Sequence, residues 1–286
     1  MFLLAILISL ALERLVPALD RLRGILWFRQ YADGLRHKLL PEDNRRGALT
    51  VLLTVLPPVL LVGLAQHLLD MQLWLFSFGL SLAVLVYALG PRDMDRQVKA
   101  YLEARAHDDD ERAQVILHEF LPFPVPDNEQ ARTDVVIDMI FVLTHERVLA
   151  VFFWFLLLGP MGAILYRLVS ELVSTPPENA NEDYWLAATR LHMLLAWLPA
   201  HLSALSFAVM GSFMHALQVW HETSLRDMSR VPVVCHQYVI RTGRAALQLD
   251  QIDGNQAIEE ALGLCSRSLI AWVTILALLT LSGLVM

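Results

Sequence analysis

The residues best suited to catalysis or ligand binding are four ionisable side chains that precede a long uncharged stretch in the middle of the sequence. Asp134 and Asp138 are four residues apart, so a helix would place both carboxylates on one face. Glu146 and Arg147 follow where the uncharged stretch begins, which is where a bilayer would start to exclude water. Such groups are candidates for a ligand pocket, and anchoring at the membrane interface is the alternative explanation.

Two further residues belong to the same candidate pocket. Arg92 follows another uncharged run, and Glu13 interrupts the apolar N-terminus, where it is either interfacial or buried for function. The carboxylates of Asp134, Asp138 and Glu146 would together repel an anionic ligand unless Arg92, Arg147 or a metal ion compensated their charge. The sequence therefore predicts a ligand that is cationic, largely neutral or bridged by a metal ion.

Other catalytic signatures are absent from the sequence. The His-Glu pairs at 118–119, 145–146 and 221–222 lack the second histidine that a zinc-protease helix requires. There is no phosphate-binding loop, dinucleotide glycine fingerprint or nucleophile elbow. Cys235 and Cys265 do not form a C-x-x-C motif, and a disulfide between them is unexpected in the cytoplasm. The sequence thus identifies no catalytic residue, no metal site and no cofactor.

The composition indicates what kind of scaffold carries these residues. Of the 286 residues, 56% are hydrophobic and only 18% are charged, whereas soluble domains carry about 25% charged residues. The apolar residues gather in long uncharged runs, which predicts an all-α, polytopic integral membrane protein in contact with the lipid bilayer. The net charge of −7 and the lack of a basic aromatic patch argue against a nucleic-acid partner.

The uncharged runs predict about six membrane spans. The segments between these runs at 15–46, 92–147 and 222–267 hold most of the lysines and arginines, so the positive-inside rule places them in the cytoplasm. A four-span alternative omits the first run and makes 191–221 interfacial, but it leaves five arginines outside. The six-span topology, with both termini in the periplasm of a bacterial inner membrane, has spans at about 1–14, 47–69, 71–91, 148–166, 191–213 and 268–286.

The central span, 148–166, contains nineteen uncharged residues, which rise about 28 Å as a helix. Pro160 is expected to kink this helix, and Gly162 to let another helix approach closely. Tyr166 and Arg167 are expected at the far, periplasmic end, where anchoring at the interface is sufficient explanation.

The same span carries a family motif. Three shorter matches accompany it, at 13–15, 100–104 and 198–211. With these residues the sequence resembles the AmpE branch of the CobD/CbiB cobalamin-biosynthesis superfamily. The resemblance implies an inner-membrane signalling modulator, encoded beside the amidase that governs β-lactamase induction. The residues that make up the motif are Phe152, Phe153, Trp154, Leu157, Gly159, Pro160, Gly162, Ala163, Tyr166 and Arg167.

The enzymatic members of the superfamily form adenosylcobinamide phosphate by ATP-dependent amide ligation, and this sequence differs from their pattern at four polar positions. Arg147 follows Glu146 where they have asparagine, Ser170 and Val173 replace an asparagine and an aspartate, and His201 replaces an arginine. The resemblance therefore predicts a non-catalytic modulator linked to cell-wall recycling and antibiotic resistance, acting on an unknown cytoplasmic ligand or protein partner. A membrane-bound ligase-like enzyme is the alternative.

Overall fold

The computed structural model confirms the all-helical fold class. Every regular element in the described part of the chain is a helix. The described residues are 2–15, 26–39, 47–71, 74–89, 93–121, 124–174, 182–222, 233–248 and 254–282.

The helices follow one another along the chain without a strand in these ranges. In order they are α1 (Phe2–Leu15), α2 (Leu26–Leu39), α3 (Gly47–Asp70), α4 (Trp74–Leu89), α5 (Asp93–Ala106), α6 (Asp110–Phe120), α7 (Glu129–Thr144), the π-helix η2 (His145–Leu149), α8 (Ala150–Ser174), α9 (Glu182–Met210), α10 (Phe213–Glu222), α11 (Val233–Leu247) and α12 (Gly254–Leu281).

Five helical stretches are long and apolar enough to cross a membrane, namely those containing α3, α4, α7 with α8, α9 and α12, and α1 contributes a shorter apolar helix. The helix α3 exposes a continuous apolar face larger than soluble proteins leave in contact with water, so this face is suited to contact with lipid. The multi-pass membrane assignment therefore holds. The exposed leucines of α3 are Leu49, Leu52, Leu53, Leu56, Leu60, Leu61, Leu64 and Leu68.

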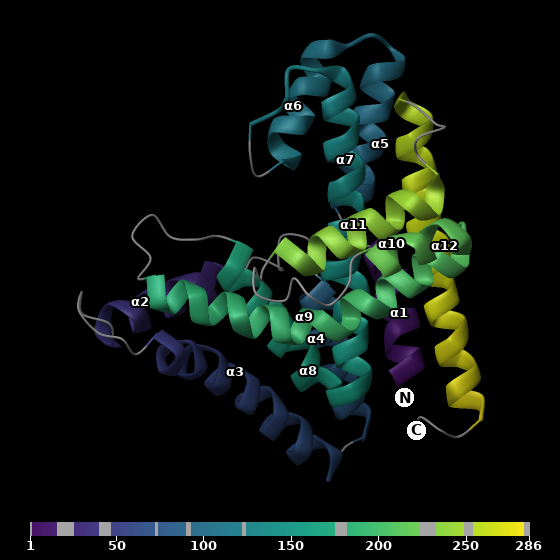
Figure 1. Ribbon diagram of the computed structural model, residues 1–286. Helices are drawn as coiled ribbons and strands as arrows, with labels where there is room; N and C mark the ends of the chain where they lie inside the picture. The colour runs from purple at the N-terminus through teal and green to yellow at the C-terminus, as the bar shows by residue number, and fades with distance from the viewer. Residues whose placement is uncertain are drawn as a thin grey trace.

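Figure 1 shows how the helices are arranged. The helices α5, α6 and α7 gather at one end of the molecule, and α12 runs along one side. The helix α3 projects away from that end, while α9 and α11 lie across the middle. The helix α11 packs closely on α7, since a Cβ atom on Gly243 of α11 would lie only 2.8 Å from the Phe141 ring of α7.

The helix α8 reverses direction instead of running straight. Gly159 has φ 65° and ψ −151°, a conformation that a residue with a Cβ atom rarely adopts. In a straight helix Trp154 and Gly162 would be about 12 Å apart. A Cβ atom on Gly162 would instead lie 2.8 Å from the Leu158 Cβ and closer still to the Trp154 carbonyl oxygen. The two halves of α8 therefore fold back on each other at Gly159.

This reversal corrects two expectations about the central span. Gly162 does provide a site of close approach, but its partner is the preceding turn of the same segment and not another helix. Pro160 follows the break and so does not simply kink a continuous helix. An uncharged run of spanning length carries no signal for a reversal, since both halves of a re-entrant hairpin are equally apolar.

The amphipathic helix α2 lies against the returning half of α8. Trp27 of α2 donates its Nε1–H to the hydroxyl of Tyr87, at 2.7 Å. Arg29 donates its Nε–H to the carboxylate of Glu171, at 2.6 Å. Residues in direct contact cannot lie on opposite faces of a membrane, so the expectation that the returning half of α8 ends on the side opposite to α2 is wrong. The prediction of six spans counted residues 148–166 as one full crossing, so it does not hold as stated, and the remaining spans stay predictions.

Candidate functional site

A single π-helical turn joins α7 to α8 and sets the direction of two titratable side chains. The N–H of Ala150 donates to the carbonyl of His145, five residues earlier, which widens the turn. His145 is fully buried and Glu146 is directed into the protein. Single π-turns are rare and occur frequently at functional sites.

The carboxylate of Glu146 receives side chains from two other helices. His236 of α11 places its Nε2 atom 2.7 Å from Glu146 Oε1, a short hydrogen bond in which the imidazole donates. His192 of α9 places its Nε2 atom 3.4 Å from the same oxygen, a looser contact. The imidazole rings of His192 and His236 lie 6.3 Å apart. We refer to Glu146, His192 and His236 as the Glu146 cluster.

Several polar atoms beside the Glu146 cluster have no protein partner among the described residues. The Tyr166 ring lies 5.8 Å from His192, and its buried hydroxyl is unpartnered. His145 contacts the Ser203 hydroxyl through Nδ1, at 3.0 Å, but its buried Nε2 is unpartnered. Buried polar atoms are nearly always hydrogen-bonded, so the cluster has the character of a site that water or a ligand completes.

A cavity of about 620 Å³ opens beside the cluster. Its wall combines titratable, amide, aromatic and aliphatic side chains from α7, α8, α9 and α11. Five of the eight lining residues are polar or charged, so the wall offers several groups that could orient a small molecule. The lining residues are Asp138, Val173, Trp185, His192, His236, Gln237, Ile240 and Arg241.

The acidic face of α7 is held by one arginine from α11. Arg244 donates through Nε to Asp138, at 2.6 Å, and through Nη1 to the carboxylate of Asp134, at 3.1 Å. It also reaches the backbone carbonyl of Asp134, at 2.9 Å. One guanidinium therefore offsets much of the negative charge that the two aspartates bring to the cavity edge.

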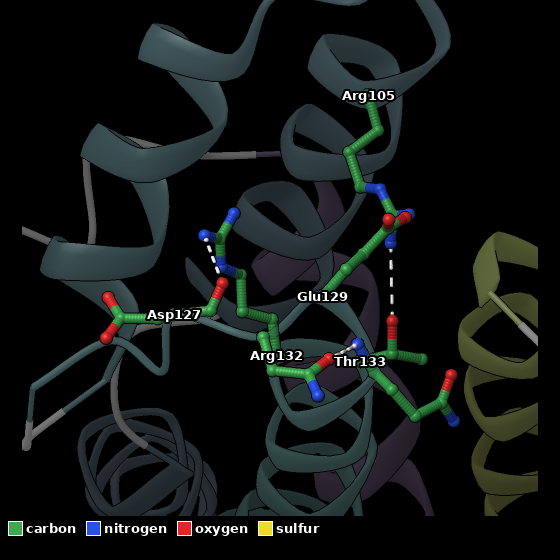
Figure 2. Close-up of polar contacts among 7 residues, drawn as sticks. Arg105, Asp127, Glu129, Arg132 and Thr133 are labelled. Atoms are coloured by element: carbon green, nitrogen blue, oxygen red, sulfur yellow. Dashed lines mark hydrogen bonds and ion pairs between the residues drawn. The ribbon is translucent and has the colours of Figure 1, made fainter.

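Contacts at the start of α7 fix this helix at the end away from the cavity (Figure 2). Arg105 of α5 forms an ion pair with Glu129 and contacts the Thr133 hydroxyl, at 3.3 Å. Arg132 donates to the backbone carbonyls of Pro126 and Asp127, at 2.7 and 2.9 Å. These contacts hold the α5–α6 region to α7 and thereby limit the freedom of the helix that carries Asp134 and Asp138.

The structure brings together some of the candidates that the sequence identified and separates others. Glu146 lies in the cluster, Asp138 on the cavity wall, and Asp134 beside it on Arg244. Arg147 instead lines a separate space of about 50 Å³ with Thr144 and Cys265.

Two candidates cannot be placed. Arg92 lies outside the described residues, and so does the side chain of Glu13, whose backbone belongs to α1.

The expectation that Tyr166 only anchors the far end of the central span is wrong. The reversal at Gly159 returns Tyr166, fully buried, to the side of Glu146, where it contacts His192. Arg167 follows it and pairs with Glu171, at 3.6 Å. Without the reversal, twenty helical residues would separate Glu146 from Tyr166 by about 30 Å.

Sequence reasoning missed the two histidines of the cluster. His192 and His201 are nine residues apart and were expected on opposite sides of a helix, and the structure does separate them. His201 lies between the tilted rings of Trp197 and Tyr238, with its ring centroid 4.7 Å from each of theirs. His236 contacts a residue 90 positions away. Neither partner of Glu146 carries a spacing signal that a sequence pattern could have revealed.

The cysteines do not add redox or nucleophilic chemistry to this region. Both are buried and free, as the expectation of no disulfide requires. Burial, and to a lesser extent the charge of Glu146, raises the pKa of the Cys235 thiol to about 11. Cys235 is therefore a thiol at neutral pH and a poor nucleophile.

Comparison with known proteins identifies the family. Residues 6–232 match the model of the CobD/CbiB protein family, which is most of the chain, so the protein belongs to that family. A protein named cobalamin biosynthesis protein CobD from Chromobacterium violaceum is 27% identical over 227 residues, covering 74% of this chain and 70% of the relative. Another of the same name from Stutzerimonas stutzeri is 38% identical over 77 residues, covering 26% and 25%. No solved structure matches the chain.

These relatives correct the predicted function. The superfamily assignment is confirmed, but neither relative is named as an AmpE protein or as a regulator of β-lactamase. The prediction of a non-catalytic signalling modulator is therefore wrong. That prediction rested on four departures from the enzymatic pattern, and the sequence does not show where these four residues lie in the fold.

Proposed function

We propose that this protein is a membrane-bound enzyme of cobalamin biosynthesis that forms an amide bond at the expense of ATP. Its relatives are named for cobalamin biosynthesis. The resemblance implies a product of the adenosylcobinamide phosphate type, formed from a corrinoid carboxylic acid and an amine. The proposed reaction site is the cavity between α7, α9 and α11, and the protein is proposed to lie in the bacterial inner membrane.

The observation that carries this proposal is the convergence of Glu146, His192 and His236 at the wall of the cavity. Amide ligation requires the removal of protons from an amine, and an imidazole paired with a carboxylate is suited to that task. It also creates negative charge on a phosphate group, which a cation such as Arg241 on the cavity wall can stabilise.

Three of the four departures from the enzymatic pattern lie outside the cavity lining, so they do not argue against this function. Arg147 lines the separate small space, His201 lies between two aromatic rings, and Ser170 is buried outside the cavity lining. Only Val173 lies on the cavity wall. Three of the four differences therefore leave the proposed reaction site unchanged.

The proposal places the cavity on the cytoplasmic side, where ATP is available. The two cavity-lining helices α7 and α11 belong to segments rich in basic residues, which the positive-inside rule assigns to the cytoplasm. The wall presents an acid held by Arg244, the imidazoles of His192 and His236, and an aromatic ring at Trp185, which together offer contacts for a mixed set of substrates.

Reconstitution of the full chain tests the proposal. The protein in lipid nanodiscs is incubated with ATP, a corrinoid carboxylic acid and a panel of short primary amines, and the products are identified by mass spectrometry. We expect a corrinoid amide whose formation depends on ATP and falls at least about 100-fold in Glu146→Gln. The matched control, Glu119→Gln on the exposed face of α6, should retain activity. Absence of any amide with the unmodified protein would reject the proposal.

A second test uses growth. Expression of this chain in a bacterium that lacks its own CobD should restore synthesis of cobalamin, and Glu146→Gln should not restore it. Failure of the unmodified chain to restore growth, at normal abundance in the membrane, would count against the function independently of the choice of amines.

A further inference from the structure

The Glu146 cluster is completed by a residue that lies beyond the family match. The match ends at residue 232, and α11 begins at Val233. We propose that His236, positioned by Glu146, accepts the proton that the amine substrate must lose before it attacks. This role rests on the proposed amide-forming function and assigns to α11 a part in the reaction.

Geometry distinguishes His236 from the other members of the cluster. Its side chain is 34% exposed and lines the cavity, whereas Glu146 and His192 are 16% and 7% exposed. Because Nε2–H donates to Glu146, the neutral imidazole carries its lone pair on Nδ1. His236 is therefore the titratable group of the cluster that is most open to a ligand in the cavity.

The remaining members of the cluster have the character of positioning residues. Glu146 fixes the tautomer of His236 and would stabilise the imidazolium that forms, as a carboxylate does for other catalytic imidazoles. His192 is held between the rings of Tyr166 and His236, at 5.8 and 6.3 Å. Tyr166 is fully buried and does not line the cavity.

The proposed step balances as follows. ATP transfers its terminal phosphoryl group to an oxygen of the carboxylate substrate, which gives an acyl phosphate and ADP. The ammonium form of the amine gives one proton to His236 Nδ1, and the freed nitrogen lone pair attacks the acyl carbon. The C–N bond forms, the C–O bond to phosphate breaks, and the second proton leaves with the phosphate. His236 then returns its proton to water, so the reaction consumes no oxidant or reductant.

The groups around His236 determine when it can act. They are Glu146 and His145 from η2, His192 from α9, Asp138 from α7 across the cavity, and Arg241 of the same helix on the cavity wall. In the described part of the chain, no hydrogen bond or ion pair joins His236 to α10 or α12, which also pack on α11. Burial lowers the pKa of His236, but the hydrogen bond and the charge of Glu146 together raise it by more, so the net shift is upward.

The first experiment compares pH profiles of amide formation by the full-length protein in nanodiscs. In the unmodified protein kcat should rise with pH as His236 loses its proton. In His236→Gln, which keeps a donor for Glu146 but cannot titrate in this range, kcat should fall about 100-fold or more and this rise should disappear, with KM little changed. The control His118→Gln, on the exposed face of α6, should keep the original profile.

A second variant guards against a purely structural effect. His236→Ala leaves room at the exposed end of the cluster, and added imidazole should restore part of its activity. Titration of labelled histidines by NMR gives a readout independent of turnover, and the pKa of His236 should fall when Glu146 is changed to Gln.

The possible outcomes separate the two proposals. If the unmodified protein forms no amide, the proposed function fails and the role of His236 fails with it. If it is active and His236→Gln keeps its kcat and pH profile, only the role of His236 is overturned. Loss of activity in His236→Ala without rescue by imidazole, together with an unshifted pKa in Glu146→Gln, would also overturn that role.

Discussion

The Oε1 atom of Glu146 and the Nε2 atom of His236 lie 2.7 Å apart, although 90 residues separate them along the chain. This contact joins η2, at the start of the central apolar segment, to α11, in a charged segment that follows all but one of the long apolar helices. His192 of α9 also contacts this carboxylate, and the reversal of α8 places Tyr166 against the His192 ring, so four separate stretches of sequence meet around the site.

The pH dependence of stability should report the Glu146–His236 contact. The folded-state pKa of His236 is raised, so its contribution is fully present below the unfolded value of about 6.5 and is lost as pH rises through the folded value. The difference in Tm between the unmodified protein and His236→Gln should therefore be largest near pH 6 and shrink at higher pH. Thermal unfolding in detergent at several pH values measures this, and a difference that grows with pH would contradict it.

Substitution of Gly162 should destabilise the fold through the reversal of α8. A Cβ atom there meets the Trp154 carbonyl and lies 2.8 Å from the Leu158 Cβ, and the backbone oxygen cannot move away easily. Gly162→Ala should therefore cost roughly 1–3 kcal/mol, the usual range for overpacking. Gly79→Ala in α4 is the matched control, because nothing lies within 4 Å of its Cβ position. Equal melting temperatures for the two variants would show that α8 does not fold back.

Cysteine labelling should place the start of α9 on the same side of the membrane as α2. Arg29 contacts Glu171, and a Cβ atom on Gly47 would lie 2.5 Å from the backbone nitrogen of Tyr184. Single cysteines at the exposed positions Lys38 and Glu182 should therefore react alike, and only in permeabilised cells. A cysteine at Asp109 provides the cytoplasmic reference. Reaction of Glu182→Cys in intact cells, with Lys38→Cys protected, would restore a straight central span.

Removal of the Arg244 guanidinium should leave two carboxylates unpaired at the cavity edge. Arg244 donates to both Asp134 and Asp138 and is 30% exposed, so Arg244→Met should cost about 1–2 kcal/mol, reduced from the value for a buried pair by solvent screening. The control is Arg267→Met, whose contact with Glu260 is long, 3.8 Å, and exposed. Chemical denaturation in detergent compares the two, and a larger loss for Arg267→Met would contradict the assignment.

The sequence by itself determined the class of structure and identified part of the candidate site. Long uncharged runs can be satisfied in a bilayer only by helices, so the all-helical membrane fold followed directly from composition. Helical periodicity placed Asp134 and Asp138 on one face, and both indeed reach the same arginine. The position of Glu146 at the start of the central run was sufficient to identify it as a candidate pocket residue.

Only the tertiary structure decided which side chains join Glu146. Arg147 is its neighbour in sequence, but successive residues of a helix point in different directions, and Arg147 faces another space. A glycine in a sequence is compatible with many backbone conformations. Gly159 therefore gave no sign that it adopts a positive φ, at which the chain reverses and returns Tyr166 to the site. His192 and His236 are isolated histidines whose contact with Glu146 depends on the paths of α9 and α11. Hydropathy and periodicity record whether a residue faces lipid, water or protein, but not which distant residue it meets.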